Sequence, residues 1–339
     1  MSCREDRATR VPVLFQCLDC RCSRCSARPA SRTSANVTRR AWLLLSMLVL
    51  TIAGCAEVDP GALPISQFTS WKLPADGPRI PAPRALYADE NDTVYMLDNA
   101  GRVLIYSSEG EVQQTWHMPE TENGRPEGVV RLLDGRIAVA DTHYHRVVFF
   151  DEYGQVESML GTKGRDAGQF VYPVAITQDP SGFIYVGEYG DRQRIQKFTP
   201  EGEFVTQFGE HGTEPGQFQR PSGIVWINSN IFAVDAFNNR IQVFSDSGEF
   251  VRIIELADNL PPFEFPYDIR ATSDGRLYVI ENKAACVTVL DEDGTFVGRF
   301  GEPGRGEDGF FNPWSLTVLS DGRILVADTG NHRIVELTP

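Results

Sequence analysis

The sequence predicts an all-β fold, a six-bladed β-propeller built from four-stranded antiparallel blades. Three observations predict it. An acid that ends a strand recurs in steps of 43 to 47 residues, at Asp98, Asp141, Glu188, Asp235, Glu281 and Asp328. A proline that opens each unit recurs in the same phase, at Pro83, Pro126, Pro173, Pro221, Pro266 and Pro313. The strand signals between these markers keep one order, so the chain holds six copies of one supersecondary unit.

Four strand signals follow one another inside each unit. A short apolar strand comes after the opening proline, as in 223–226, and a β-branched strand leads to the acid, as in 183–186. A third strand starts at or near an arginine, as in 240–244. A fourth strand, such as 204–208, follows a turn of the Pro-Glu-Gly-Glu type. No segment of the repeats has the periodicity of a helix.

The sixth unit has only three strand signals, because the chain ends at Pro339. A ring of blades is stable only when it closes, since an open blade exposes an apolar face and an unpaired edge. We therefore expect segment 65–73, just ahead of the first unit, to supply the missing outer strand. The spacing of its aromatic residues differs from that of the other outer strands, so the sequence leaves the register of this strand open.

Three linkers between units share a glycine pattern that ends shortly before the opening proline. They span 161–173, 209–221 and 301–313, and each carries a phenylalanine close to its last glycine. Together with runs such as Asp328-Thr-Gly-Asn-His-Arg-Ile, the pattern resembles the NHL repeat family of six-bladed propellers. The resemblance covers residues 80 to 339. The first unit is a shortened variant, and the fifth has 281–286 where the acid and arginine are expected.

Residues 41–55 have the features of a signal-peptide core that ends in a lipidation site. The apolar run 41–51 is too short to span a bilayer and follows two arginines. Residues 52–55, Ile-Ala-Gly-Cys, resemble the bacterial lipobox, in which Cys55 would receive a diacylglyceryl group and become the mature N-terminus. The alternative is a short secretory signal with an incidental cysteine. The lipobox implies an exported protein anchored in the cell envelope, and Ala56 favours the outer membrane of a diderm cell.

The lipobox divides the chain into four parts. Residues 1–40 are a leader, disordered or the product of a start codon assigned too early, with initiation near Val37. Residues 41–55 are the lipoprotein signal, and 56–77 are a tether and the ring-closing strand. Residues 78–339 are the propeller. The leader holds five of the seven cysteines in a spacing that invites a zinc interpretation, which its place upstream of the cleavage site disfavours.

The charge of the chain becomes more acidic when the leader and signal are removed. Residues 1–55 hold nine arginines and three acids, so the rest carries 23 basic and 43 acidic residues. A surface this acidic repels phosphate, which argues against nucleic acid as a partner. Only Cys286 remains besides Cys55, so no disulfide framework is expected in the mature chain.

The strand order brings the opening prolines and the acid–turn–arginine loops to one mouth of the central channel. Side chains there that can hydrogen-bond or stack form a candidate contact set for a small ligand or peptide. The set is Arg84, Glu127, Tyr267, Asp268, Trp314 and His143. The alternative is that the aromatic residues only plug the channel. The recurring acid and arginine are interpreted as a structural pair, with a calcium ion held by several of these acids as the alternative.

A binding or scaffolding module is the function that these observations favour, with an envelope protein or a small ligand or peptide as its partner. No catalytic set and no cofactor are predicted, and calcium or zinc at the channel mouth is the alternative. A rival hypothesis is a metal-dependent envelope enzyme of the lactonase or amidating-lyase kind. The peptidyl-α-hydroxyglycine α-amidating lyase is a similar propeller that holds zinc with three histidines from different blades. Here His143 and His145 share one blade, which argues against a zinc lyase. A stalk domain in a larger assembly is a third hypothesis.

Overall fold

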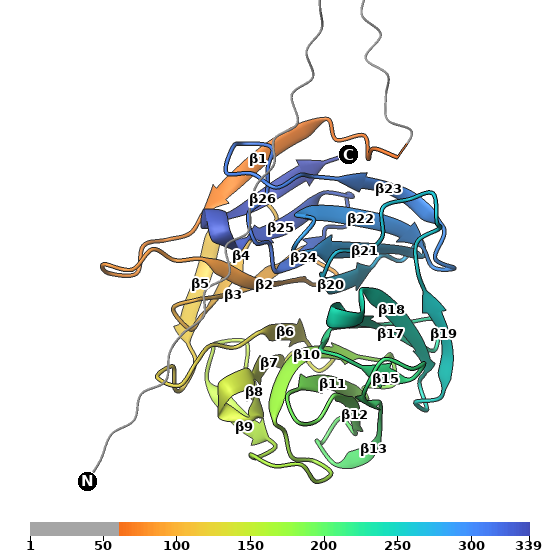
Figure 1. The fold of residues 1–339 in the computed structure, drawn as a ribbon. Coiled ribbons are helices and arrows are strands. Elements are labelled where there is room, and N and C mark those ends of the chain that lie inside the picture. The colour runs from red at the N-terminus through yellow and green to blue at the C-terminus, as the bar shows by residue number, and fades with distance from the viewer. Residues whose placement is uncertain (1–60) are drawn as a thin grey trace, which may run out of the picture. The chain divides into compact units, whose positions relative to one another are not determined.

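The computed structural model describes residues 61–339, so the predictions for the leader, the signal core and Cys55 lie outside the described residues. The repeats form six four-stranded antiparallel sheets that follow one another around a central axis (Figure 1). The first strand of each blade lies next to this axis, since first strands of neighbouring blades contact one another. No helix within 61–339 is long and apolar enough to cross a membrane. The predicted fold class is confirmed.

Blades 1 to 3 follow the chain without crossovers. Their strands are β2 (Pro83–Ala88), β3 (Val94–Asp98), β4 (Arg102–Tyr106) and β5 (Val112–His117) in blade 1; β6 (Gly128–Arg131), β7 (Ile137–Asp141), β8 (Arg146–Phe150) and β9 (Val156–Leu160) in blade 2; and β10 (Tyr172–Gln178), β11 (Ile184–Tyr189), β12 (Arg194–Phe198) and β13 (Phe204–Phe208) in blade 3. Each second and third strand is largely buried, whereas each fourth strand is largely exposed.

Blades 4 to 6 repeat this order. Their strands are β16 (Pro221–Ile227), β17 (Asn230–Asp235), β18 (Arg240–Ser245) and β19 (Phe250–Ile254) in blade 4; β20 (Pro266–Ala271), β21 (Arg276–Glu281), β22 (Cys286–Asp291) and β23 (Phe296–Phe300) in blade 5; and β24 (Ser315–Val318), β25 (Ile324–Asp328) and β26 (Arg333–Thr338) in blade 6. Two short strands, β14 (Glu210–His211) and β15 (Gln217–Phe218), pair within the linker before blade 4.

Blade 6 is closed by β1 (Gln67–Lys72), which pairs antiparallel with β26, from Gln67 opposite Thr338 to Lys72 opposite Arg333. The expected ring closure is therefore confirmed, and its register is defined. Trp71 lies opposite Ile334, the second residue of β26. The same place in the other blades is held by Trp116, Leu160, Phe208, Ile254 and Phe300.

The acid that ends each second strand is fully buried and paired with a guanidinium. In blade 6 the Nε of Arg333 donates to Asp328 at 2.8 Å, and Asn331 donates to the same carboxylate at 2.8 Å. In blades 2, 4 and 6 the turn is a single turn of 3-10 helix, where the sequence predicted a polar turn alone: η1 (Thr142–Tyr144), η2 (Ala236–Asn238) and η3 (Thr329–Asn331). The structural interpretation of the acid and arginine agrees with this geometry.

The glycine pattern of the three linkers places a glycine against a buried phenylalanine ring. Gly209 has φ +88°, and a Cβ on it would lie 2.5 Å from the ring of Phe218. Gly161 and Gly301 lie against Phe170 and Phe310 in the same way. A side chain at these positions would be strained by both the backbone and the ring. The linkers thereby bring the chain from the outer strand of one blade back to the axis.

Candidate ligand-binding site at the channel mouth

The opening prolines and the strand-ending acids lie at the same end of the blades, as the strand order predicted. Pro83 pairs with Asp98 across β2 and β3, and Pro266 pairs with Glu281 across β20 and β21. The residues beside these prolines therefore face one mouth of the channel. This register brings side chains from several blades together there.

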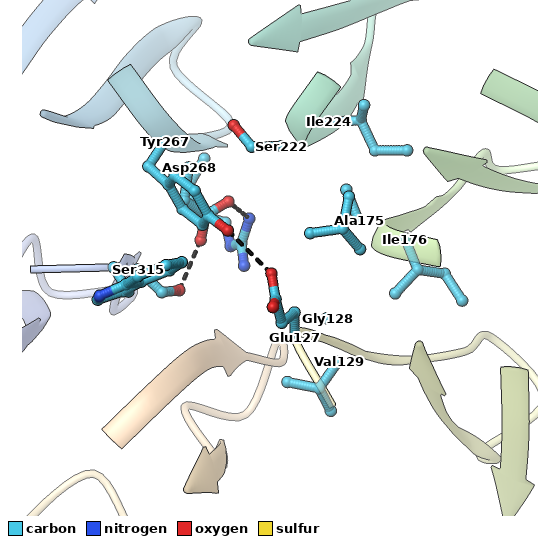
Figure 2. A pocket seen from close by; sticks show the side chains of 13 residues that line it. Glu127, Gly128, Val129, Ala175, Ile176, Ser222, Ile224, Tyr267, Asp268 and Ser315 are labelled. Atoms are coloured by element: carbon cyan, nitrogen blue, oxygen red, sulfur yellow. Dashed lines mark hydrogen bonds and ion pairs between the residues drawn. The ribbon is translucent and has the colours of Figure 1, made fainter. Parts of the chain in front are cut away.

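A hydrogen-bonded bridge crosses the mouth. The hydroxyl of Tyr267 in blade 5 donates to Glu127 Oε2 of blade 2 at 2.8 Å (Figure 2). Arg84 Nη2 of blade 1 donates to the other oxygen of Glu127 at 3.0 Å. Arg220, just ahead of blade 4, donates to the Tyr267 hydroxyl at 2.8 Å and lies 3.7 Å from Glu127. Because blades 2 and 5 stand on opposite sides of a ring of six, this network spans the channel.

Aromatic rings hold the bridge in place. The ring of Trp314 meets the ring of Tyr267 edge-on at 4.4 Å between centroids. The guanidinium of Arg84 lies 4.9 Å from the centre of the Trp314 ring, and that of Arg220 lies 4.1 Å from the Tyr189 ring. Burial, and next the nearby Glu127 carboxylate, raise the pKa of Tyr267 well above its usual value. The hydroxyl is therefore neutral and remains a hydrogen-bond donor to Glu127.

Asp268, next to Tyr267 in the chain, belongs to a second polar cluster that joins three blades. Its carboxylate pairs with Arg270 at 2.7 Å and accepts a hydrogen bond from the Ser315 hydroxyl at 2.5 Å. Arg270 in turn donates to the backbone oxygen of Leu86 in blade 1 at 2.7 Å. Glu127 and Tyr267 of the bridge and Asp268 and Arg270 of this cluster line a cavity of about 20 Å³, which is room for about one water molecule.

The six residues predicted for the contact set are therefore brought to one end of the channel in different roles. Arg84, Glu127, Tyr267 and Trp314 form the bridge and its aromatic support. His143 stands apart from the bridge and packs against the ring of Tyr172 at 5.8 Å.

Two residues of the network were missed by the sequence analysis, namely Arg220 and Tyr189. Arg220 directly precedes an opening proline, and Tyr189 directly follows a strand-ending acid. Examining the residues on both sides of each marker would have found them.

The donor set near the mouth does not fit a zinc site. Within 61–339, no three His, Cys, Asp or Glu side chains are grouped so that they could hold a metal ion. His145 and His332 direct their Nδ1 atoms at the backbone oxygens of Val171 and Pro81, in the next blade around the ring. These two histidines therefore link neighbouring blades.

Comparison with known proteins agrees with the architecture. Residues 310–337 match the family model of the NHL repeat. The chain is 29% identical over 272 residues to the rat (Rattus norvegicus) peptidylglycine alpha-amidating monooxygenase, which covers 75% of this chain but only 26% of that protein. It is 25% identical to human NHL repeat-containing protein 3 over 54% of this chain and 56% of that protein. The chain thus spans about a quarter of the monooxygenase and just over half of the NHL protein.

Other similarities are to a lyase and to solved propellers. The chain is 28% identical to a probable peptidyl-alpha-hydroxyglycine alpha-amidating lyase of Caenorhabditis elegans, over 62% of this chain and 63% of that one. Among solved structures, virginiamycin B lyase from Staphylococcus aureus superposes with a TM-score of 0.59 at 16% identity, over 80% of this chain and 99% of that one. An auxiliary nutrient binding protein from Bacteroides ovatus gives 0.59 at 13% identity, over 80% and 76%. At these identities the structures show the fold alone.

Proposed function

Because the chain is an NHL-repeat six-bladed β-propeller, we propose that it works by binding at its channel mouth and not by catalysis within the channel. The observation that supports this proposal is the bridge between Glu127 and Tyr267. A substrate entering the channel would have to break the bridge and displace a buried tyrosine, and the cavity that these two residues line holds about 20 Å³. A ligand or partner would instead contact the partly exposed side chains of Arg84 and Arg220, with Trp314 beside Arg84.

We further propose that the propeller is a lipid-anchored module of the cell envelope, with an envelope protein or a small ligand or peptide as its partner. The lipobox-like residues 52–55 support this part of the proposal. Replacing the thiol tests it: Cys55→Ser is expected to move the protein from the membrane fraction to the soluble fraction of the cell. An unchanged membrane fraction would contradict lipid attachment at Cys55.

A direct assay tests binding against catalysis. The full chain, in detergent and with one equivalent of zinc, is incubated with a peptidyl-α-hydroxyglycine, and release of the amide product is followed. The proposal predicts no turnover above the protein-free control. Turnover that scales with protein and is lost in Tyr267→Phe would contradict it.

An amidating-lyase-like enzyme is the second candidate, and the similarity to the Caenorhabditis elegans lyase favours it. In the resembled family this activity uses three histidines that hold zinc. Within residues 61–339, no three potential metal ligands are grouped in this way. Stoichiometric zinc that is lost together with activity in His143→Ala would support the enzyme.

A further inference from the structure

Two guanidinium groups share a single carboxylate at the mouth. Arg84 makes one hydrogen bond within the described part of the chain, through Nη2 to Glu127, and its buried Nε has no acceptor there. Arg220 lies 3.7 Å from the same carboxylate, and its buried Nε also lacks an acceptor. The side chains of Arg84 and Arg220 are 20% and 17% exposed, so solvent reaches part of each.

Within residues 61–339, no second acid forms an ion pair with Arg84 or Arg220. Asp268, the other carboxylate that lines the cavity at the mouth, is already bound by Arg270 and by Ser315. The mouth therefore carries one positive charge in excess, in a chain whose formal net charge is −14. A partly buried cation whose N–H groups lack acceptors is energetically unfavourable until an anion pairs with it. One further carboxylate at the mouth would balance the charge.

The aromatic rings fix the geometry of the two arginines. Arg84 stacks on Trp314 and Arg220 stacks on Tyr189, so each guanidinium has one face covered while its side chain stays partly exposed. Tyr189 is itself stacked on Tyr172, at 5.2 Å between centroids. A guanidinium that stacks on an aromatic ring favours a planar carboxylate as its partner. The aromatic ring next to it favours a ligand in which a ring or an apolar group is attached to that carboxylate.

We infer that the channel mouth is a binding site for an organic carboxylate, held by Arg84 and Arg220 with its ring or apolar part against Trp314 and Tyr189. This inference rests on the proposed binding function and adds its ligand chemistry. An acidic sugar and a free amino-acid carboxylate both have this chemistry. Matched pairs of charged and neutral ligands separate these two sources.

Matched ligand pairs test the inference by calorimetric titration of the full chain in detergent. Glucuronate is compared with glucose, and N-acetylphenylalanine is compared with its amide. We expect the acid of at least one pair to bind ten-fold more tightly than its neutral partner, and the pair that responds identifies the source. Equal affinities within both pairs, or no binding of any probe at millimolar concentration, would overturn the inference.

A variant set separates the site from general charge effects. Arg84→Gln and Arg84→Lys are expected to weaken the acid at least ten-fold, because neither offers the paired guanidinium donors. The control is Arg276→Gln, which removes the same charge from a half-exposed side chain at the start of β21, where the blade meets the other end of the channel. Circular dichroism verifies that each variant is folded. An Arg84→Gln variant that is folded and binds the acid normally would overturn the assignment, whereas turnover in the lyase assay would overturn the proposed function itself.

Discussion

The carboxylate of Asp141 differs from the other five strand-ending acids, because only one of its oxygens has a partner. Arg146 Nε donates to Oδ2 at 3.0 Å, whereas Oδ1 is buried without a hydrogen bond. In blades 3 to 6 that second oxygen accepts a backbone N–H from the preceding linker, as Phe311 donates to Asp328 at 2.7 Å. Within the described residues, the linker of blade 2 supplies no such donor to Asp141. Burial raises the pKa of Asp141 to about 6, against the opposing effect of Arg146.

The raised pKa of Asp141 predicts a specific dependence of stability on pH. Between the usual pKa near 3.8 and the folded value of about 6, the folded protein holds a proton that the unfolded chain has lost. The contribution of Asp141 to stability is therefore lost as the pH rises through this window. The side chain in Asp141→Asn cannot ionise. Between pH 4 and pH 7, the free energy of unfolding of the wild type should therefore fall by about 1–3 kcal/mol more than that of the variant.

Urea unfolding at several pH values measures this difference. Asp328→Asn is the matched control, because both oxygens of Asp328 are hydrogen-bonded. The control removes a carboxylate that is fully hydrogen-bonded, so it should be less stable than wild type at pH 7. Parallel pH profiles for wild type and Asp141→Asn would refute the assignment.

Blade 5 keeps the buried ion pair although its sequence lacks the usual arginine. Cys286 occupies that position, and Arg299 from the outer strand β23 pairs with Glu281 at 2.8 Å instead. The departure at 281–286 was visible in the sequence. The arginine that replaces the usual partner could not be identified from the sequence. It comes from the next strand, and only the pairing of β22 with β23 brings it close to Glu281.

Removing the guanidinium of Arg299 should leave a buried carboxylate without its counter-ion. Arg299→Gln is expected to lower the free energy of unfolding by about 3–5 kcal/mol. Arg252→Gln, on the outer strand of blade 4, removes contacts to two backbone oxygens and should cost clearly less. Guanidinium-chloride unfolding measures both. Equal effects of the two variants would contradict the role assigned to Arg299.

At the scale of the strand, the outer strand of one blade covers a turn of the next. Trp116 of β5 lies on Gly154 of blade 2, and Phe208 of β13 lies on Gly248 of blade 4. Trp71 of β1 lies on Gly110 of blade 1 in the same way, and its Nε1 donates to Glu336 at 2.8 Å. The register of β1 follows from this contact between blades. Spacing within the strand alone did not reveal it.

The matching positions of Trp71 and Trp116 in their blades predict similar effects of truncation. Trp71→Ala and Trp116→Ala should each lower the free energy of unfolding by about 3–5 kcal/mol, because each leaves a cavity between two blades. Denaturant unfolding of the two variants under the same conditions provides the measurement. A loss below about 1 kcal/mol for Trp71→Ala alone would show that β1 does not act as an outer strand.

At the scale of the whole molecule, the sequence predicted the ring better than it predicted the site. The blades could be predicted because each is a local repeat with its own markers. The network at the mouth joins Glu127 to Tyr267, which are 140 residues apart, and only the closed ring brings them together. The sequence therefore named most members of the site without showing that they bridge the channel.

Ring closure should make the stability of the blades cooperative. Deleting residues 61–73 removes β1 and the cover of the blade 1 turn, leaving the edge of β26 unpaired. We expect the main unfolding transition to broaden or disappear and not merely shift, because open arrays lose cooperativity. Calorimetry of the deleted chain tests this. A single sharp transition close to that of the full chain would contradict closure by this segment.

A direct contact between opposite sides of the ring underlies the proposed function, and a double-mutant cycle on Glu127→Ala and Tyr267→Phe measures it. The free energies of unfolding of the wild type, the two single variants and the double variant give the coupling between the side chains. A direct hydrogen bond to a carboxylate predicts a coupling of about 1.5–3 kcal/mol. Additive effects, within about 0.3–0.5 kcal/mol, would show that the two residues do not meet across the channel and that its mouth is open.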